Sequence, residues 1–101
     1  MTKWIPAANV KEVCALFNIL DRSSATFVVR PSFQTANDPL NPDTWANYDS
    51  DISSAGLYTT GVDDVSATTN SKYLVRFGIG VKNASGGLQT GTVEMTVTMR
   101  G

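Results

Sequence analysis

Alternation of apolar residues with mostly polar or small ones over two C-terminal segments, 73–81 and 92–100, constrains the fold of this chain most. The apolar positions of these segments are Tyr73, Val75, Phe77, Ile79, Val81, Val93, Met95, Val97 and Met99. A period of two is typical of a strand that buries one face and exposes the other. Residues 83–90 include two adjacent glycines and favour a turn. The pattern therefore predicts an antiparallel hairpin whose apolar side chains face the core.

The segment 9–20 fits either a helix or a strand. Helical spacing is followed by Val10, Val13, Cys14, Phe17 and Leu20. Strand-like alternation is followed by Val13, Ala15, Phe17 and Ile19. Because the rest of the chain favours strands and turns, we favour a strand here.

Shorter strand-like segments occupy the middle of the chain, at 26–35, 44–48 and 56–60. Pro31 lacks a backbone donor, so it must lie at an edge, a bulge or a kink of its strand. Val65 is the expected inward anchor of the polar segment that follows. These features predict an all-β fold, an antiparallel β-sandwich or jelly roll of about six to eight short strands.

The length and composition restrict the organisation and the function classes. A chain of 101 residues fits one domain, residues 1–101, with residues 1–8 as an N-terminal arm. Eight Lys and Arg against nine Asp and Glu give a formal net charge of −1, which argues against nucleic-acid binding. No apolar run approaches the roughly 20 residues that span a bilayer, and no signal peptide is visible. We therefore expect a soluble protein that binds neither nucleic acid nor membrane.

No motif predicts catalysis. The chain has no His, which is the commonest general base. The acidic pairs Asp49/Asp51 and Asp63/Asp64 lie in polar segments, where aspartates usually form turns. Cys14, the only cysteine, lies among apolar residues, so we expect a buried and inert thiol. The sequence predicts neither an enzyme nor a bound cofactor.

One segment carries oxygen ligands of the kind that Ca²⁺ prefers. Asn37, Asp38, Asn41 and Asp43 lie within seven residues of one another. Two prolines among them equally favour a stiff turn, and the spacing does not match a known calcium loop. We predict no metal site and leave calcium open at this segment.

Aromatic and apolar residues outside the predicted strands are the candidate contact surface. Trp4, Ile5 and Pro6 precede the first periodic element, and we expect them to pack back onto the sandwich or to dock on another subunit. Trp45 and Tyr48 are the next candidates. A sugar-binding platform formed by Trp4, Trp45, Tyr48 and Tyr58 is the alternative use of these side chains.

Two segments resemble discoidin-like jelly-roll domains. The sequence Gln34-Thr35-Ala36-Asn37-Asp38, followed by Trp45, looks like a turn of those domains, and Lys72-Tyr73-Leu74-Val75-Arg76-Phe77 looks like one of their strands. The resemblance implies a sandwich of a kind that often binds glycans or lipid head groups. This chain is shorter, lacks paired cysteines and has no Gly after Asp38, so the resemblance extends to the fold and not to the ligand site.

The whole chain is similar in character to small virion proteins of tailed bacteriophages, such as capsid decoration proteins. The shared marks are an all-β chain with a retained Met1, loops rich in Thr, Ser, Asn and Gly, and no catalytic residues. The resemblance implies a structural virion component that coats or cements a capsid and contacts copies of itself or other virion proteins. A carbohydrate-binding module, which would be extracellular, is the alternative.

Overall fold

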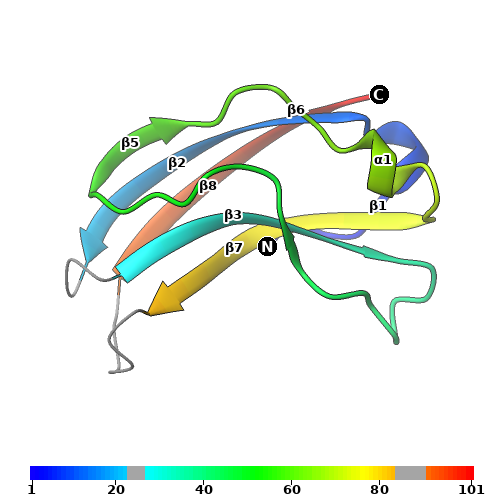
Figure 1. The fold of residues 1–101 in the computed structure, drawn as a ribbon, viewed down its shortest axis with the longest axis horizontal. Coiled ribbons are helices and arrows are strands. Elements are labelled where there is room, and N and C mark those ends of the chain that lie inside the picture. Colours follow the sequence, from blue (N-terminus) through cyan, green and yellow to red (C-terminus); the bar gives the residue numbers. More distant parts are fainter. Residues whose placement is uncertain (23–26, 84–90) are drawn as a thin grey trace.

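Two antiparallel sheets packed face to face form the structure (Figure 1). The computed structural model describes residues 1–22, 27–83 and 91–101. The first sheet has the strand order β1 (Ile5–Pro6), β7 (Leu74–Asn83), β3 (Phe27–Ala36) and β4 (Ala46–Asn47). In the second sheet, β2 (Glu12–Arg22) pairs on one side with β5 (Gly56–Thr59) and β6 (Asp63–Asp64), and on the other side with β8 (Gly91–Arg100). The predicted all-β sandwich is confirmed.

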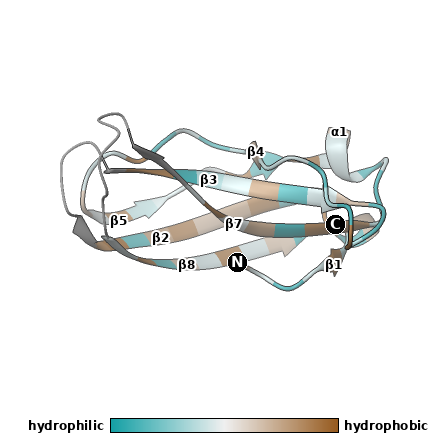
Figure 2. Cartoon of the chain, turned by 90° about the horizontal axis from the view of Figure 1, so that it is seen from below, coloured by the Kyte–Doolittle hydropathy of each residue, from teal (hydrophilic) through white to brown (hydrophobic). Residues whose placement is uncertain are grey.

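Among the residues that the structure describes, helical structure is limited to two short elements at one end of the sandwich. These are the 3₁₀ helix η1 (Ala7–Asn9) and the single-turn helix α1 (Ser66–Thr69) (Figure 1). Within the described ranges, neither is long or apolar enough to cross a membrane. Figure 2 shows that the apolar residues lie mainly along strands such as β2 and β7, whereas the segments that connect the strands are more hydrophilic.

The ambiguous N-terminal segment is the strand β2, as the alternation favoured. Val13, Ala15, Phe17 and Ile19 are all buried between the sheets. Because successive residues of a strand point to opposite faces, the intervening side chains lie on the outer face of the second sheet. The register of β2 with β8 shifts after Ile19, which marks a local bulge.

The predicted hairpin of the two C-terminal strands is wrong. β7 pairs with β3 and β1, whereas β8 pairs with β2 in the opposite sheet. The expected turn at 83–90 lies outside the described residues, apart from Asn83 at the end of β7. Alternation correctly predicts that each strand buries one face, but both sheets of a sandwich offer such a face, so the pattern does not choose the partner. Arg100 consequently pairs with Glu12 at 2.9 Å, and Arg76 lies on the other sheet from Glu94.

Pro31 lies inside β3 without breaking it. The backbone N–H of Tyr48 donates to the Pro31 carbonyl at 3.1 Å, so the polar backbone groups of Pro31 face β4 rather than β7. On that side, within the described ranges, β3 pairs only with the two-residue β4 and, at Val29, with Ile52. The missing donor therefore costs no hydrogen bond of the long β3–β7 ladder.

The core consists of two adjoining clusters. Among the described residues, the buried members of the first cluster are Ala7, Val10, Val13, Phe33, Val65, Val75 and Phe77. Those of the second cluster are Ala15, Phe17, Ile19 and Val29. Tyr48 and Val97 pack against both clusters. The rings of Phe33, Tyr48 and Phe77 contact one another, with Tyr48 edge-on to Phe77 at a centroid separation of 5.7 Å. This aromatic group joins β3 and β7 to the segment after β4.

Phe77→Ala is expected to destabilise the fold by about 3–5 kcal/mol, because Phe77 is fully buried and its loss leaves a cavity beside Phe33 and Tyr48. Urea denaturation followed by circular dichroism measures the change. Tyr73→Ala is the matched control, because this aromatic side chain is 76% exposed and its truncation should change stability by no more than about 0.5 kcal/mol. Equal stability of the two variants would contradict the burial of Phe77 in the core.

Candidate functional site

The five residues predicted as a contact surface do not form one surface. Trp4 and Trp45 meet on the outer face of the first sheet, around Arg76. Ile5 belongs to β1 and packs against the core, and Pro6, its exposed neighbour in β1, pairs with Leu74. Tyr48 is partly buried between the sheets. The candidate residues therefore lie in three different environments.

The tryptophan clamp, which we define as Trp4, Arg76 and Trp45, covers the outer face of β7. The Arg76 Cζ lies 4.2 Å from the centroid of the Trp4 ring and 5.5 Å from that of Trp45. Both distances are in the range of cation–π contacts. The Arg76 Nε also donates to Gln34 Oε1 at 2.8 Å, which fixes the guanidinium over β3 and β7.

Gly78 provides the space for Trp45. A Cβ atom at Gly78 would lie 2.9 Å from the Trp45 Cη2, closer than real Cβ contacts. The indole ring therefore lies directly on the β7 backbone, and one of its sides is occupied by the protein's own chain.

The N-terminal segment packs back onto the sandwich, which is the first of the two expected alternatives. The backbone N–H of Thr2 donates to the Phe77 carbonyl at 2.8 Å, and the Phe77 N–H donates to Thr2 Oγ1 at 2.9 Å. Ile5 pairs with Val75 in the register of β1 and β7. Residues 2–6 therefore cover part of the outer edge of β7.

An acidic cleft of about 580 Å³ opens between the sheets, on the side of β4 and β6. Its lining includes Phe33, Asn47, Tyr48, Asp49, Ser50, Asp63, Asp64, Val65, Ala67 and Thr68. The Tyr48 hydroxyl and the Asp63 Oδ2 are buried there, and neither has a hydrogen-bond partner within the described part of the chain. Tyr48 thus contributes its ring to the core and its hydroxyl to the cleft.

Two carboxyl groups in the acidic cleft share an electrostatic environment. Burial, followed by the neighbouring carboxyl group of Asp49, raises the pKa of Asp63 from 3.8 to about 6. Burial and the same two carboxylates raise the pKa of Tyr48, so its hydroxyl stays protonated. Below about pH 6 Asp63 therefore binds a proton, which removes one negative charge from the cleft.

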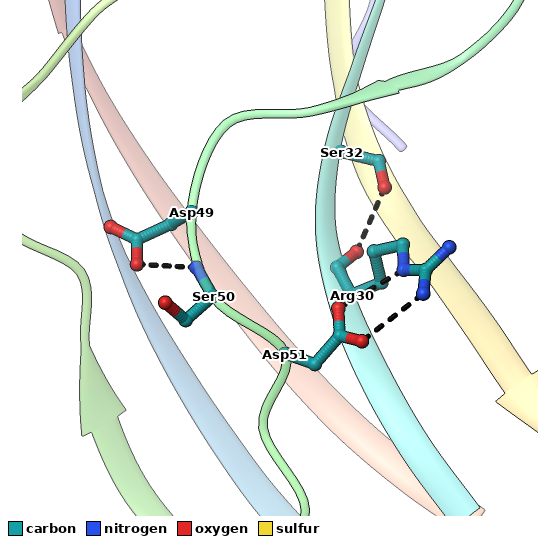
Figure 3. Close-up of polar contacts among 5 residues, drawn as sticks. All are labelled: Arg30, Ser32, Asp49, Ser50 and Asp51. Atoms are coloured by element: carbon teal, nitrogen blue, oxygen red, sulfur yellow. Dashed lines mark hydrogen bonds and ion pairs between the residues drawn. The ribbon is translucent and has the colours of Figure 1, made fainter.

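The segment that carries Asp49 crosses from one sheet to the other (Figure 1). Figure 3 shows how it is held: Asp51 accepts two hydrogen bonds from the Arg30 guanidinium, at 3.0 and 3.1 Å, and Asp49 accepts the backbone N–H of Ser50. Ile52 adds two backbone hydrogen bonds with Val29. This local turn places Asp49 beside Asp63.

The residues considered for calcium bind other protein groups. Asp38 accepts the Leu40 N–H and the Asn41 side-chain amide, as in an Asx turn. Asp43 pairs with Lys72 Nζ at 2.9 Å, and this pairing lowers the pKa of Asp43. Within residues 1–22, 27–83 and 91–101, no group of three or more acidic, His or Cys side chains could hold a metal ion.

The outer face of the second sheet is uncharged at its centre. We call it the leucine–threonine face and define it by Leu16, Leu57, Thr59, Thr96 and Thr98, which share that side in the registers of β5, β2 and β8. Leu57 is 66% exposed. The sequence analysis did not predict this face, although the alternation of apolar and polar residues indicates which positions of β2 and β8 point outward.

Cys14 lies beside the leucine–threonine face, which corrects the expectation of a buried thiol. Its side chain is partly exposed, and its Sγ donates to the Thr60 carbonyl at 3.6 Å. Cys14 alternates with the buried Val13 and Ala15, so its outward direction follows from the strand reading of this segment.

Comparisons of the chain with models of protein families, with curated proteins and with solved structures found no match.

Gly78→Val is expected to displace Trp45 from the β7 backbone, because the added side chain would occupy the position of the indole ring. The chain has only two tryptophans, Trp4 and Trp45, so a red shift of the emission spectrum would report the opening of the tryptophan clamp. Gly61→Val is the control, since nothing lies within 4 Å of a Cβ at Gly61. An unchanged emission spectrum in Gly78→Val would contradict the observed packing.

Asp63→Asn is expected to raise the melting temperature at pH 8 and to change it little at pH 4. The folded chain holds the Asp63 proton more tightly than the unfolded chain, so this group's contribution to stability is full below about pH 4 and is lost as the pH rises through about 6. Thermal melts across this pH range test the prediction.

Asp64→Asn is the matched control for Asp63→Asn. Its carboxylate accepts the Ser66 N–H at 2.8 Å, and hydrogen bonds from Ser66 lower its pKa. This substitution should therefore lower the melting temperature at neutral pH, where the ionised group stabilises the fold. The same direction of change at pH 8 in both variants would refute the electrostatic account of the cleft.

Proposed function

We propose that this chain is a non-enzymatic structural protein that acts by binding other protein surfaces, as a virion component that coats or cements a capsid. The observation that carries the proposal is the leucine–threonine face. Three exposed or half-exposed apolar side chains, Leu16, Leu57 and Val62, lie on or beside it. Contiguous apolar patches on a soluble protein commonly mark interaction sites. The placement in a virion rests on the resemblance in character to phage decoration proteins.

The carbohydrate-binding alternative depends on a stacking platform formed by four aromatic side chains. Arg76 stacks on Trp4, and Trp45 lies on Gly78. Tyr48 is edge-on to Phe77 inside the sandwich, and Tyr58 packs against the core from β5. The four aromatic side chains therefore do not present a common stacking surface to a sugar.

Leu57→Glu should weaken assembly of the chain, because it places a charge at the most exposed leucine of the leucine–threonine face. Size-exclusion chromatography with light scattering, over a wide range of protein concentrations, measures the assembly. Leu40→Glu is the matched control, since Leu40 is 88% exposed in the turn after β3 and lies outside this face.

A glycan array with the wild-type chain separates the two function classes. A structural protein assembles and gives no glycan signal. A chain that stays monomeric at every concentration and binds an oligosaccharide would overturn the proposal in favour of the sugar-binding module.

A further inference from the structure

The long strand β8 is an edge strand of the second sheet. It has ten residues and pairs with β2 along one side, and no described residue pairs with its other side. Exposed edge strands of this length readily pair with another strand, and proteins usually block them with Pro, bulges or central charges. β8 contains no Pro, and Glu94 is the only charged residue before Arg100.

The backbone of β8 presents its free hydrogen-bonding groups at defined residues. Ala15, which is opposite Val97, directs its N–H and carbonyl to Thr60 on the far side of β2. In an antiparallel pair, opposite residues either exchange both hydrogen bonds or exchange none, so the N–H and carbonyl of Val97 point to the free edge. The same holds for Met95 and Met99, which lie two residues to either side.

The sequence of this edge is a palindrome centred on Val97. The segment Met95-Thr96-Val97-Thr98-Met99 reads the same in both directions, and it is flanked by Glu94 and Arg100. A two-fold axis through Val97 therefore matches each side chain of one copy with an equal or complementary one of the other. The flanking residues carry opposite charges, so the arrangement also brings Glu94 opposite the partner's Arg100.

We infer that a second copy of this chain pairs with β8 in antiparallel orientation about Val97, which joins the second sheets of two protomers into one continuous sheet. Val97 of each copy exchanges two backbone hydrogen bonds with the other, and Met95 exchanges two with the partner's Met99. Thr96 lies opposite the partner's Thr98 on the outer face. Threonine pairs and opposite charges are favourable cross-strand neighbours.

The charges of the described structure fit this register. Glu94 is exposed and has no ion pair within the described part of the chain. Arg100 binds Glu12 in its own chain through Nε and Nη2, and its side chain is 65% exposed, so it is open to a second carboxylate. Registers centred on Met95 or Thr96 also satisfy the backbone, but they place Glu94 opposite a threonine.

This inference rests on the proposed function, because it names one contact by which copies of a coat protein associate. A single strand pair is small compared with the ~1,200 Å² of stable interfaces, so the dimer should dissociate on dilution. The paired sheet would also join two leucine–threonine faces into one larger surface.

Charge variants test the register. Glu94→Lys and Arg100→Glu should each weaken dimerisation roughly tenfold, because each places like charges opposite one another at both ends of the pair. An equimolar mixture of the two variants should recover the dimer, since the heterodimer restores two opposite-charge pairs. Sedimentation velocity measures the three samples, and Thr92→Lys, on the same strand and face but outside the palindrome, should behave as wild type.

Hydrogen exchange supplies a second measurement that does not depend on the variants. The amides of Met95, Val97 and Met99 should exchange quickly in dilute protein and slowly in concentrated protein, whereas those of Thr96 and Thr98 should stay protected throughout. A wild-type chain whose Val97 amide exchanges quickly at every concentration would overturn the inference, as would a mixture that fails to recover the dimer. If assembly persists in Glu94→Lys and is lost in Leu57→Glu, the β8 pairing is wrong and the proposed function stands.

Discussion

The packing of Phe77 against Phe33 and Tyr48 is the contact on which the rest of the structure depends. It ties β7 to β3 and to the segment after β4. Because strand residues alternate in direction, burial of Phe77 turns its neighbours Arg76 and Gly78 outward, where they form the seat of Trp4 and Trp45. The same contact buries the Tyr48 ring and so carries its hydroxyl into the acidic cleft. One core interaction thus positions two surface features on different sides of the first sheet.

Local pattern predicted the long strands and the faces that they bury, but not how the strands pair. Tyr73 is an exception, because the alternation placed it with Val75 and Phe77 on the core face, whereas it is 76% exposed just before β7. The alternation of Val93, Met95, Val97 and Met99 with exposed residues is as expected. The predicted partner was wrong, because the inner faces of both sheets accept the same pattern and only long-range packing chooses between them. β7 instead pairs with β3 along its whole length, from Leu74 to Asn83.

The candidate contact residues show both what local pattern predicts and what it does not. Trp45 and Tyr48 are three residues apart and looked equivalent as aromatic residues near a short strand. The alternation of side chains along a strand places residues three apart on opposite faces. In the structure Trp45 accordingly lies outside the first sheet and Tyr48 lies inside the sandwich, so this difference was predictable from the sequence. The acidic cleft could not be predicted, because Asp49 and Asp63 lie fourteen residues apart and are brought together by a turn that the Arg30–Asp51 pair holds.

The sheet edges differ in a way that bears on assembly. Three of the four edges are formed by short strands. β1 and β4, at the two edges of the first sheet, have two residues each; β5 and β6, which share one edge of the second sheet, have four and two. Short strands offer little backbone for pairing with another chain, and the N-terminal segment adds cover along β7. β8 departs from this pattern by its length and by its unblocked edge. Since the other edges restrict pairing, the fold directs strand addition to one side of one sheet, and the palindrome about Val97 makes an identical strand the best match there. Any protein that assembles by strand addition needs such a restriction, because an edge that accepts any strand leads to aggregation rather than to a defined contact.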